Sequence, residues 1–140
     1  MVALDKRNYA DNTSEEPRVA ILERITDVST QPSKPGVREV PASAVIGMRE
    51  RGDDLTFVDV REQHEWNLFR IHGALHIPLG ALREEAEARL RPDRTIVLYC
   101  ARGGRAATGA ATLVELGFAD VLSVEGGLMG WVNAGGPLDE

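Results

Sequence analysis

Residues 95–105 read TIVLYCARGGR, and this segment gives the clearest indication of the fold class. Its first half, residues 95–99, is an apolar run of strand length, as expected for a central strand that is covered on both faces. Its second half is a loop with a glycine pair, and the alanine-rich segment 104–116 has apolar residues at helical spacing. A buried strand that leads through a short loop into a helix is the unit from which parallel α/β sheets are built.

The same alternation continues on both sides of this stretch. Further strands are expected at 37–40, 55–60, 74–77 and 121–124, and helices at 41–51, 62–69, 81–90, 104–116 and 128–132. This order predicts an α/β fold with a mostly parallel sheet and helices on both of its faces.

Three of the expected helices have a recognisable inward face. In chain order, these faces carry Ala44, Val45 and Met48; Leu82, Ala86 and Leu90; and Ala106, Ala110, Leu113 and Val114. On the outer side of the second helix, Glu85 and Arg89 have the spacing of an ion pair. Gly117 suits the left-handed position that ends the third helix, with Phe118 covering Leu113 in a Schellman ending.

Length and composition indicate one ordinary globular domain. The chain has 140 residues, of which 43% are hydrophobic and 27% charged. We expect a polar N-terminal arm and linker at residues 1–36, with a short helix at 19–25, then a domain at 37–135 and a C-terminal tail at 136–140. Oligomeric state is left open.

Charge and cysteine content exclude several classes of partner. The formal net charge of −6 gives no global attraction to nucleic acid or to anionic lipid, so an anion site has to be made locally. No segment has the ~20 apolar residues of a membrane span, and the polar N-terminus lacks the apolar core of a secretory signal. Cys100 is the only cysteine, which excludes an internal disulfide, disfavours a cysteine-based zinc site and fits a reducing cytoplasm.

The loop after the central strand carries the candidate chemistry. Cys100 lies where the strand ends and the next helix begins, so free N–H groups and the helix dipole favour its thiolate. Gly103 and Gly104 let the backbone curl around an anion, and Arg102 and Arg105 add positive charge. A buried structural cysteine is the alternative, but it needs neither the glycine pair nor the two arginines. The pattern therefore indicates a nucleophilic sulfur in a cradle for an anionic substrate.

Four motifs in order resemble those of the rhodanese family over about residues 37–135. The loop at 99–105 is similar to the family's active-site loop, a strand ending in Tyr-Cys followed by four residues and Arg. The other three are DVRE at 59–62 with Glu65 and Trp66 beyond, IHGALHIP at 71–78, and LGF at 116–118 followed by EGGLMGW at 125–131.

The resemblance implies a rhodanese-like three-layer fold with a five-stranded parallel sheet flanked by helices. It implies a thiosulfate sulfurtransferase, in which Cys100 takes sulfur from a small anionic donor as a persulfide and passes it to cyanide, a thiol or a sulfur carrier. Arg105 would hold the loop closed, and the loop residues Ala101, Arg102, Gly103 and Gly104 would offer N–H groups to the outer sulfur. Asp59 and Arg61 would support the loop from a neighbouring strand end, and no cofactor or metal is implied.

Two positions depart from the family pattern. Arg70 stands where the family often has histidine, and we do not transfer that histidine's role to His72. Arg102 stands where the loop is often small and polar. We expect Arg102 to lie near the pocket mouth and to assist a doubly charged donor; the alternative is a surface arginine that pairs with a carboxylate.

Other candidate residues favour structural roles. The spacing of His64, His72 and His76 is not that of a metal site. We interpret Gly126 and Gly127 as a tight turn before the last helix, and Trp131 as a packing anchor beneath it.

Two other functions stay open from the sequence. The first is a rhodanese module that binds partners without catalysis, although such modules commonly lack the cysteine. The second is a cysteine-based phosphatase or arsenate reductase, which also uses a looped anion site. Those enzymes place five residues between Cys and Arg, whereas Cys100 and Arg105 enclose four.

Overall fold

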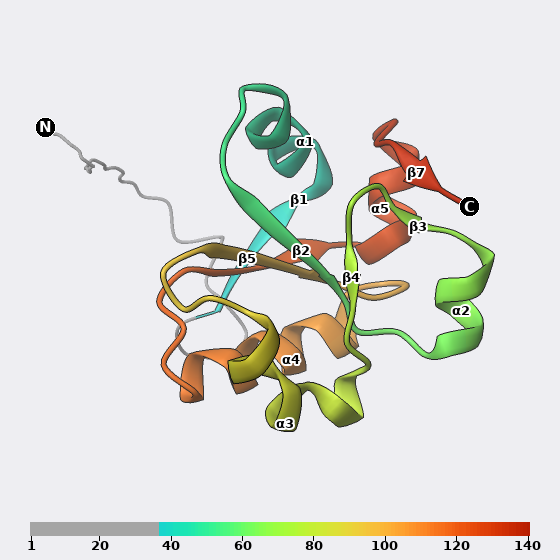
Figure 1. Cartoon of the computed structure of the whole chain (residues 1–140). Helices are drawn as coiled ribbons and strands as arrows, with labels where there is room; N and C mark the ends of the chain where they lie inside the picture. The colour runs from blue at the N-terminus through green and yellow to red at the C-terminus, as the bar shows by residue number, and fades with distance from the viewer. Residues whose placement is uncertain (1–36) are drawn as a thin grey trace, which may run out of the picture. The chain divides into compact units, whose positions relative to one another are not determined.

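The computed structural model describes residues 37–140, whose centre is a five-stranded parallel sheet (Figure 1). The strands lie side by side in the order β1-β6-β5-β2-β4, and every neighbouring pair is parallel. Their bounds are β1 Arg38–Pro41, β2 Leu55–Asp59, β4 Leu75–His76, β5 Thr95–Tyr99 and β6 Val121–Glu125. The predicted α/β fold is thus confirmed, and β5 is the central strand.

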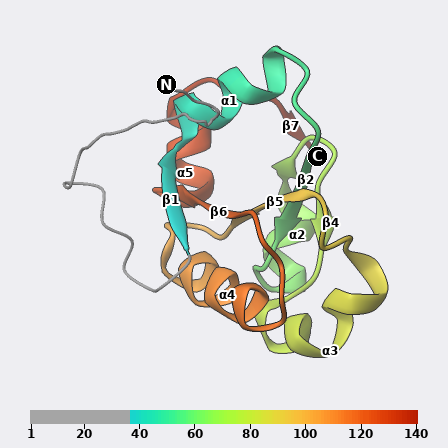
Figure 2. The same ribbon diagram turned by 90° about the vertical axis from the view of Figure 1, so that its left-hand side faces the viewer.

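Helices cover both faces of this sheet (Figure 2). One face carries α1 and α5, the other carries α3 and α4, and α2 lies at the end of the sheet next to β3. Their bounds are α1 Ala42–Glu50, α2 Gln63–Leu68, α3 Leu79–Arg89, α4 Gly104–Glu115 and α5 Gly127–Asn133. Alternate side chains of β5 feed the two cores: Ile96 and Leu98 pack with α3 and α4, and Val97 and Tyr99 pack with α1 and α5.

The expected helix faces are confirmed except at one position. The inward residues of α3 and α4 are buried, with Val114 half-buried, and Arg89 pairs with Glu85 at 3.1 Å. Phe118 N–H donates to the Leu113 carbonyl at 3.0 Å, which completes the predicted Schellman ending. In α1, the expected Val45 is buried and Met48 is half-buried, but Ala44 is exposed and Ala42 is buried in its place.

Two short strands lie outside the main sheet. β3 (Arg70–Ile71) pairs antiparallel with β7 (Leu138–Asp139), which belongs to the segment expected as a C-terminal tail. Each has only two residues, too few for a recognisable sequence pattern. Trp131 lies beneath this region and is fully buried, as expected for a packing anchor. Its ring meets that of Phe57 edge-on, with the ring centres 5.5 Å apart, and its indole N–H donates to the Pro137 carbonyl.

The expected arm and linker at residues 1–36, with the helix at 19–25, lie outside the described residues. Among the helices between residues 37 and 140, none has both the length and the apolarity needed to cross a bilayer.

Candidate active site

The sulfur of Cys100 lies between the end of β5 and the beginning of α4. Gly103 N–H donates to Cys100 Sγ at 3.0 Å, and Ala106 N–H donates to it at 3.4 Å. Gly103 adopts φ +116° at the position before α4, a conformation that L side chains rarely take. The glycine therefore lets the chain turn sharply enough to aim N–H groups at the sulfur, where they stabilise a thiolate.

The beginning of α5 holds the opposite side of the loop. Leu128 N–H donates to the Cys100 carbonyl at 2.7 Å, and Met129 N–H donates to the Ala101 carbonyl at 3.2 Å. In trans peptides, the carbonyl and the following N–H point in opposite directions. The N–H groups of Ala101 and Arg102 therefore point away from α5.

Gly127 is the residue that makes this close approach possible. Its φ is +60°, and a Cβ there would lie 2.5 Å from the Cys100 carbonyl oxygen and 2.7 Å from two backbone atoms of Ala101. The sequence predicted a tight turn at this glycine pair but not its contact with the loop. The signal was present in the EGGLMGW motif at 125–131, which could have been linked to the loop motif as its support.

Arg105 is fixed by an acidic partner on α2. Its Nη1 and Nη2 atoms lie 2.9 and 3.1 Å from the two carboxylate oxygens of Glu65. Glu65 also accepts the Glu62 N–H at 2.9 Å, as part of the capping box that begins α2. Sequence reasoning missed this role of Glu65, although the residue was part of the recognised motif.

The ion pair shifts the titration of both partners. The hydrogen bonds from Arg105 outweigh burial and lower the pKa of Glu65 to about 2. The hydrogen bonds to Glu65 likewise raise the pKa of Arg105 against burial, and nearby Cys100 acts in the same direction. A permanently charged guanidinium therefore stands beside the sulfur.

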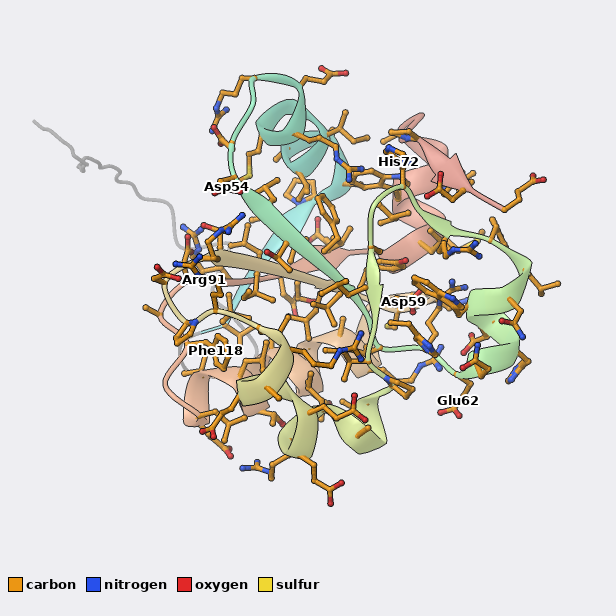
Figure 3. The ribbon with its side chains drawn as sticks, in the orientation of Figure 1. Asp54, Asp59, Glu62, His72, Arg91 and Phe118 are labelled. Atoms are coloured by element: carbon orange, nitrogen blue, oxygen red, sulfur yellow. The ribbon has the colours of Figure 1, made fainter. Side chains whose placement is uncertain are left out.

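Asp59, labelled in Figure 3 at the end of β2, forms a buried ion pair with Arg61. Arg61 Nη2 lies 2.8 Å from an Asp59 oxygen and also donates to the Phe69 carbonyl at 2.7 Å. Burial lowers the pKa of Arg61, but the hydrogen bonds and charge of Asp59 outweigh it and raise that pKa. Asp59 is in register with Tyr99 of β5, so the pair braces the strand end from which Cys100 emerges.

The remaining loop residues line two separate hollows. Ala101 lines an apolar hollow of about 230 Å³ between α2 and α5. Arg102, Gly103 and Gly104 line a larger hollow of about 490 Å³ that faces β6, together with Glu125. The Arg102 side chain is exposed, so the loop brings the predicted residues together but gives Arg102 a solvent-facing position.

Two histidines and Arg70 have structural partners. His76 stacks on Trp66 with ring centres 4.9 Å apart and donates its Nε2–H to the Arg61 carbonyl at 2.8 Å. His72 pairs with Asp139. Arg70 donates to the Trp66 carbonyl at 2.9 Å. Over the described stretch, 37–140, no three metal-binding side chains gather into a metal site.

Comparison of the chain with known proteins identifies its family. The model of the rhodanese-like domain matches residues 42–134. The putative sulfurtransferase YtwF of Bacillus subtilis is 35% identical over 95 residues, which are 68% of this chain and 90% of that protein. The probable adenylyltransferase/sulfurtransferase MoeZ of Mycobacterium tuberculosis is 38% identical over 85 residues, 60% of this chain but only 22% of MoeZ.

A solved structure agrees with these matches. The solution structure of the rhodanese-like domain of Alr3790 from Anabaena has a TM-score of 0.67 and 28% sequence identity, and it covers 78% of this chain and 79% of that one.

Proposed function

The chain belongs to the rhodanese-like domain family, and we propose that it transfers sulfane sulfur through a persulfide on Cys100. Thiosulfate is the donor that we propose for the assay, and a thiol or a sulfur-carrier protein is the acceptor in the cell. Relatives named as sulfurtransferases support the reaction class. The observation that carries the proposal is the position of Cys100 Sγ, which accepts two backbone N–H groups beside the Arg105 guanidinium.

The proposed loading step is a displacement at sulfur. The Cys100 thiolate attacks the outer sulfur of thiosulfate, and a new S–S bond forms between Sγ and that sulfur. The S–S bond within thiosulfate breaks, and its electron pair leaves with sulfite. Cyanide then attacks the outer sulfur of the persulfide, forms thiocyanate and returns the electron pair to Sγ.

Each residue around the loop has a proposed part in this cycle. The N–H groups of Gly103 and Ala106 stabilise the thiolate that attacks and later leaves. Ala101, Arg102 and Gly104 offer further N–H groups to the outer sulfur.

Charged pairs position this loop. Arg105, held by Glu65, keeps positive charge at the site during both steps. Asp59 and Arg61 are positioning residues, because they touch the strand end and not the sulfur. Since the cycle needs a free thiolate, we propose a reducing compartment such as the cytoplasm.

Loop size disfavours the phosphatase alternative. Four residues separate Cys100 from Arg105, and within this short loop Gly103 N–H is already directed at Sγ. A tetrahedral phosphate needs a wider ring of N–H groups, whereas one terminal sulfur atom does not.

One set of assays tests the proposal against both alternatives. We expect the wild-type protein to form thiocyanate from thiosulfate and cyanide, Cys100→Ser to form none while staying folded, and neither to hydrolyse p-nitrophenyl phosphate faster than ~1 per second. Thiocyanate formation by Cys100→Ser contradicts the mechanism. Absence of turnover in the wild type favours an interaction module, and rapid phosphate hydrolysis that needs Cys100 favours a phosphatase.

A further inference from the structure

We propose that the hollow beside Ala101 binds the apolar organic group of the sulfur acceptor. The preferred acceptor is then a thiol with a small alkyl or aryl group close to its sulfur. This inference rests on the proposed persulfide at Cys100 and specifies the class of thiol that removes the sulfur.

The hollow concentrates the exposed apolar side chains of the domain. Between residues 37 and 140, four large hydrophobic side chains are notably exposed, and three of them line this hollow: Leu68 at 70%, Met129 at 55% and Val132 at 43%. The other apolar lining residues are Phe69, Ala101 and Leu128. Keeping apolar surface in water is unfavourable, and such a cluster beside a reactive loop marks a binding site.

Charge complementarity favours a neutral occupant. Two charged residues, Arg61 and Glu65, line the hollow, and each is already neutralised by a partner. Arg61 is paired with Asp59, and Glu65 is paired with Arg105. The hollow therefore offers no unpaired charge to an anion.

The volume of the hollow limits the size of the group that it can bind. The volume of about 230 Å³ is below the ~300–1,000 Å³ typical of pockets for drug-sized ligands. It suits a single small group such as a butyl chain or one leucine side chain.

Position connects the hollow to the sulfur. Ala101 directly follows Cys100, and Glu65 joins the wall of the hollow to Arg105 beside Sγ. An acceptor whose apolar group enters the hollow can thus present its own sulfur to the persulfide. The other hollow carries the charged residues Arg102 and Glu125 in its wall, and none of the four exposed large hydrophobic side chains lines it.

The transfer step needs no further reactant. The acceptor thiolate, RS⁻, attacks the outer sulfur of the Cys100 persulfide in its protonated form. An S–S bond forms between the acceptor sulfur and the outer sulfur, and the bond from the outer sulfur to Sγ breaks. The products are the organic persulfide RSSH and the Cys100 thiolate, which keeps the electron pair.

The test uses the full chain loaded with thiosulfate, with the persulfide verified by intact mass. Ethanethiol, propanethiol and butanethiol have similar thiol acidity, so differences in their second-order rate constants report burial of the alkyl chain. We expect the rate constant to rise by up to about fourfold for each added methylene. A matched pair of peptides, with Leu or Ser next to their single Cys, shows whether a peptide thiol uses the same hollow.

Variants locate the effect. The double variant Leu68→Ser/Met129→Ser should lower the butanethiol-to-ethanethiol ratio at least about threefold, because the side chains that cover the alkyl chain are lost. Leu138→Ser is the matched control, since Leu138 is exposed at 36% but lies outside the hollow, and it should leave the ratio unchanged.

Each outcome is decisive. A chain-length dependence that the double variant removes supports the inference, and a Leu preference in the peptides extends it to protein acceptors. A loaded protein whose rates are flat across both the thiols and the peptides overturns the inference alone. A protein that forms no persulfide overturns the proposed function, and the inference with it.

Discussion

Cys100 is 1% exposed, yet its sulfur is surrounded by groups that favour a negative charge. Two N–H groups reach Sγ directly, and Arg105 stands beside it with its charge fixed by Glu65. A cysteine that served only to fill the core would gain nothing from these donors. These contacts support the proposal that Cys100 is the reactive residue.

The variant Arg102→Ala tests whether Arg102 helps to bind the donor anion. In Arg102→Ala we expect the KM for thiosulfate to rise by up to about tenfold at low salt, with kcat little changed, because an exposed cation attracts a dianion but is screened by solvent and salt. Steady-state kinetics at low and high salt measure this. Arg91→Ala, an exposed arginine outside both hollows that pairs with Asp93, is the control with the same change in charge. An unchanged KM at low salt means that Arg102 is only a surface residue.

Helix α5 has only seven residues, but it contacts the active-site loop directly. Its first N–H groups hold the carbonyls of Cys100 and Ala101, and its side chains Leu128, Met129 and Val132 line the apolar hollow. One short helix thus supports the active loop and makes a wall beside it.

Gly127→Ala tests this support. The new Cβ would overlap the backbone of Cys100 and Ala101, so we expect a loss of stability and a fall in kcat of at least about tenfold, as the loop is displaced. Gly135→Ala is the matched control, because its φ is also positive, +84°, but its Cβ would meet nothing within 4 Å. It should cost about 1 kcal/mol of stability and leave kcat unchanged. Equal kcat values for the two variants contradict the proposed role of α5. Urea unfolding and thiocyanate assays give the two readouts.

Sequence predicted those elements that have a strong local pattern. β5 and the inward faces of α3 and α4 follow from apolar periodicity. The expected face of α1 was wrong at Ala44, which is exposed, because the buried side of the helix passes through Ala42 and Val45, and residues two apart lie on nearly opposite sides of a helix. The β3–β7 pair has no pattern of its own, since two residues per strand are too few to show one.

The sequence likewise predicted only part of the candidate site. Cys100, the glycine pair and Arg105 lie within six residues, so their chemistry could be read from one loop. The pairing of Arg105 with Glu65 spans 40 residues of sequence, and the seating of Gly127 against the loop depends on how α5 packs. Contacts of this kind are created by the fold: Glu65 and Gly127 belong to recognised motifs, but neither motif by itself shows which residues it meets.

At the scale of the whole domain, the Glu65–Arg105 pair joins α2 to α4 and should contribute pH-dependent stability. Folding lowers the pKa of Glu65 from 4.5 to about 2, so the folded state favours the carboxylate. The contribution is therefore fully present above about pH 4.5 and is lost as the pH falls toward about 2. Because both side chains are partly exposed, we expect it to be about 1 kcal/mol.

Glu65→Gln measures this contribution. The free energy of unfolding in urea should differ between wild type and variant by about 1 kcal/mol at pH 7, and the difference should shrink at pH 3. Glu115→Gln, which breaks the more exposed pair with Arg83, is the control and should change little at either pH. A difference for Glu65→Gln that is the same at both pH values would show that the carboxylate does not act through its charge.

The intact mass of the protein after treatment with thiosulfate tests sulfur transfer through Cys100 most directly. We expect the wild-type chain to gain the mass of one sulfur atom and to lose it again with cyanide as thiocyanate appears. The Cys100→Ser variant should gain no mass. Since Cys100 is the only cysteine, no other residue can hold the persulfide. A wild-type protein that stays unmodified in thiosulfate, or a serine variant that still gains a sulfur atom removable by cyanide, would contradict a sulfur transfer that proceeds through Cys100.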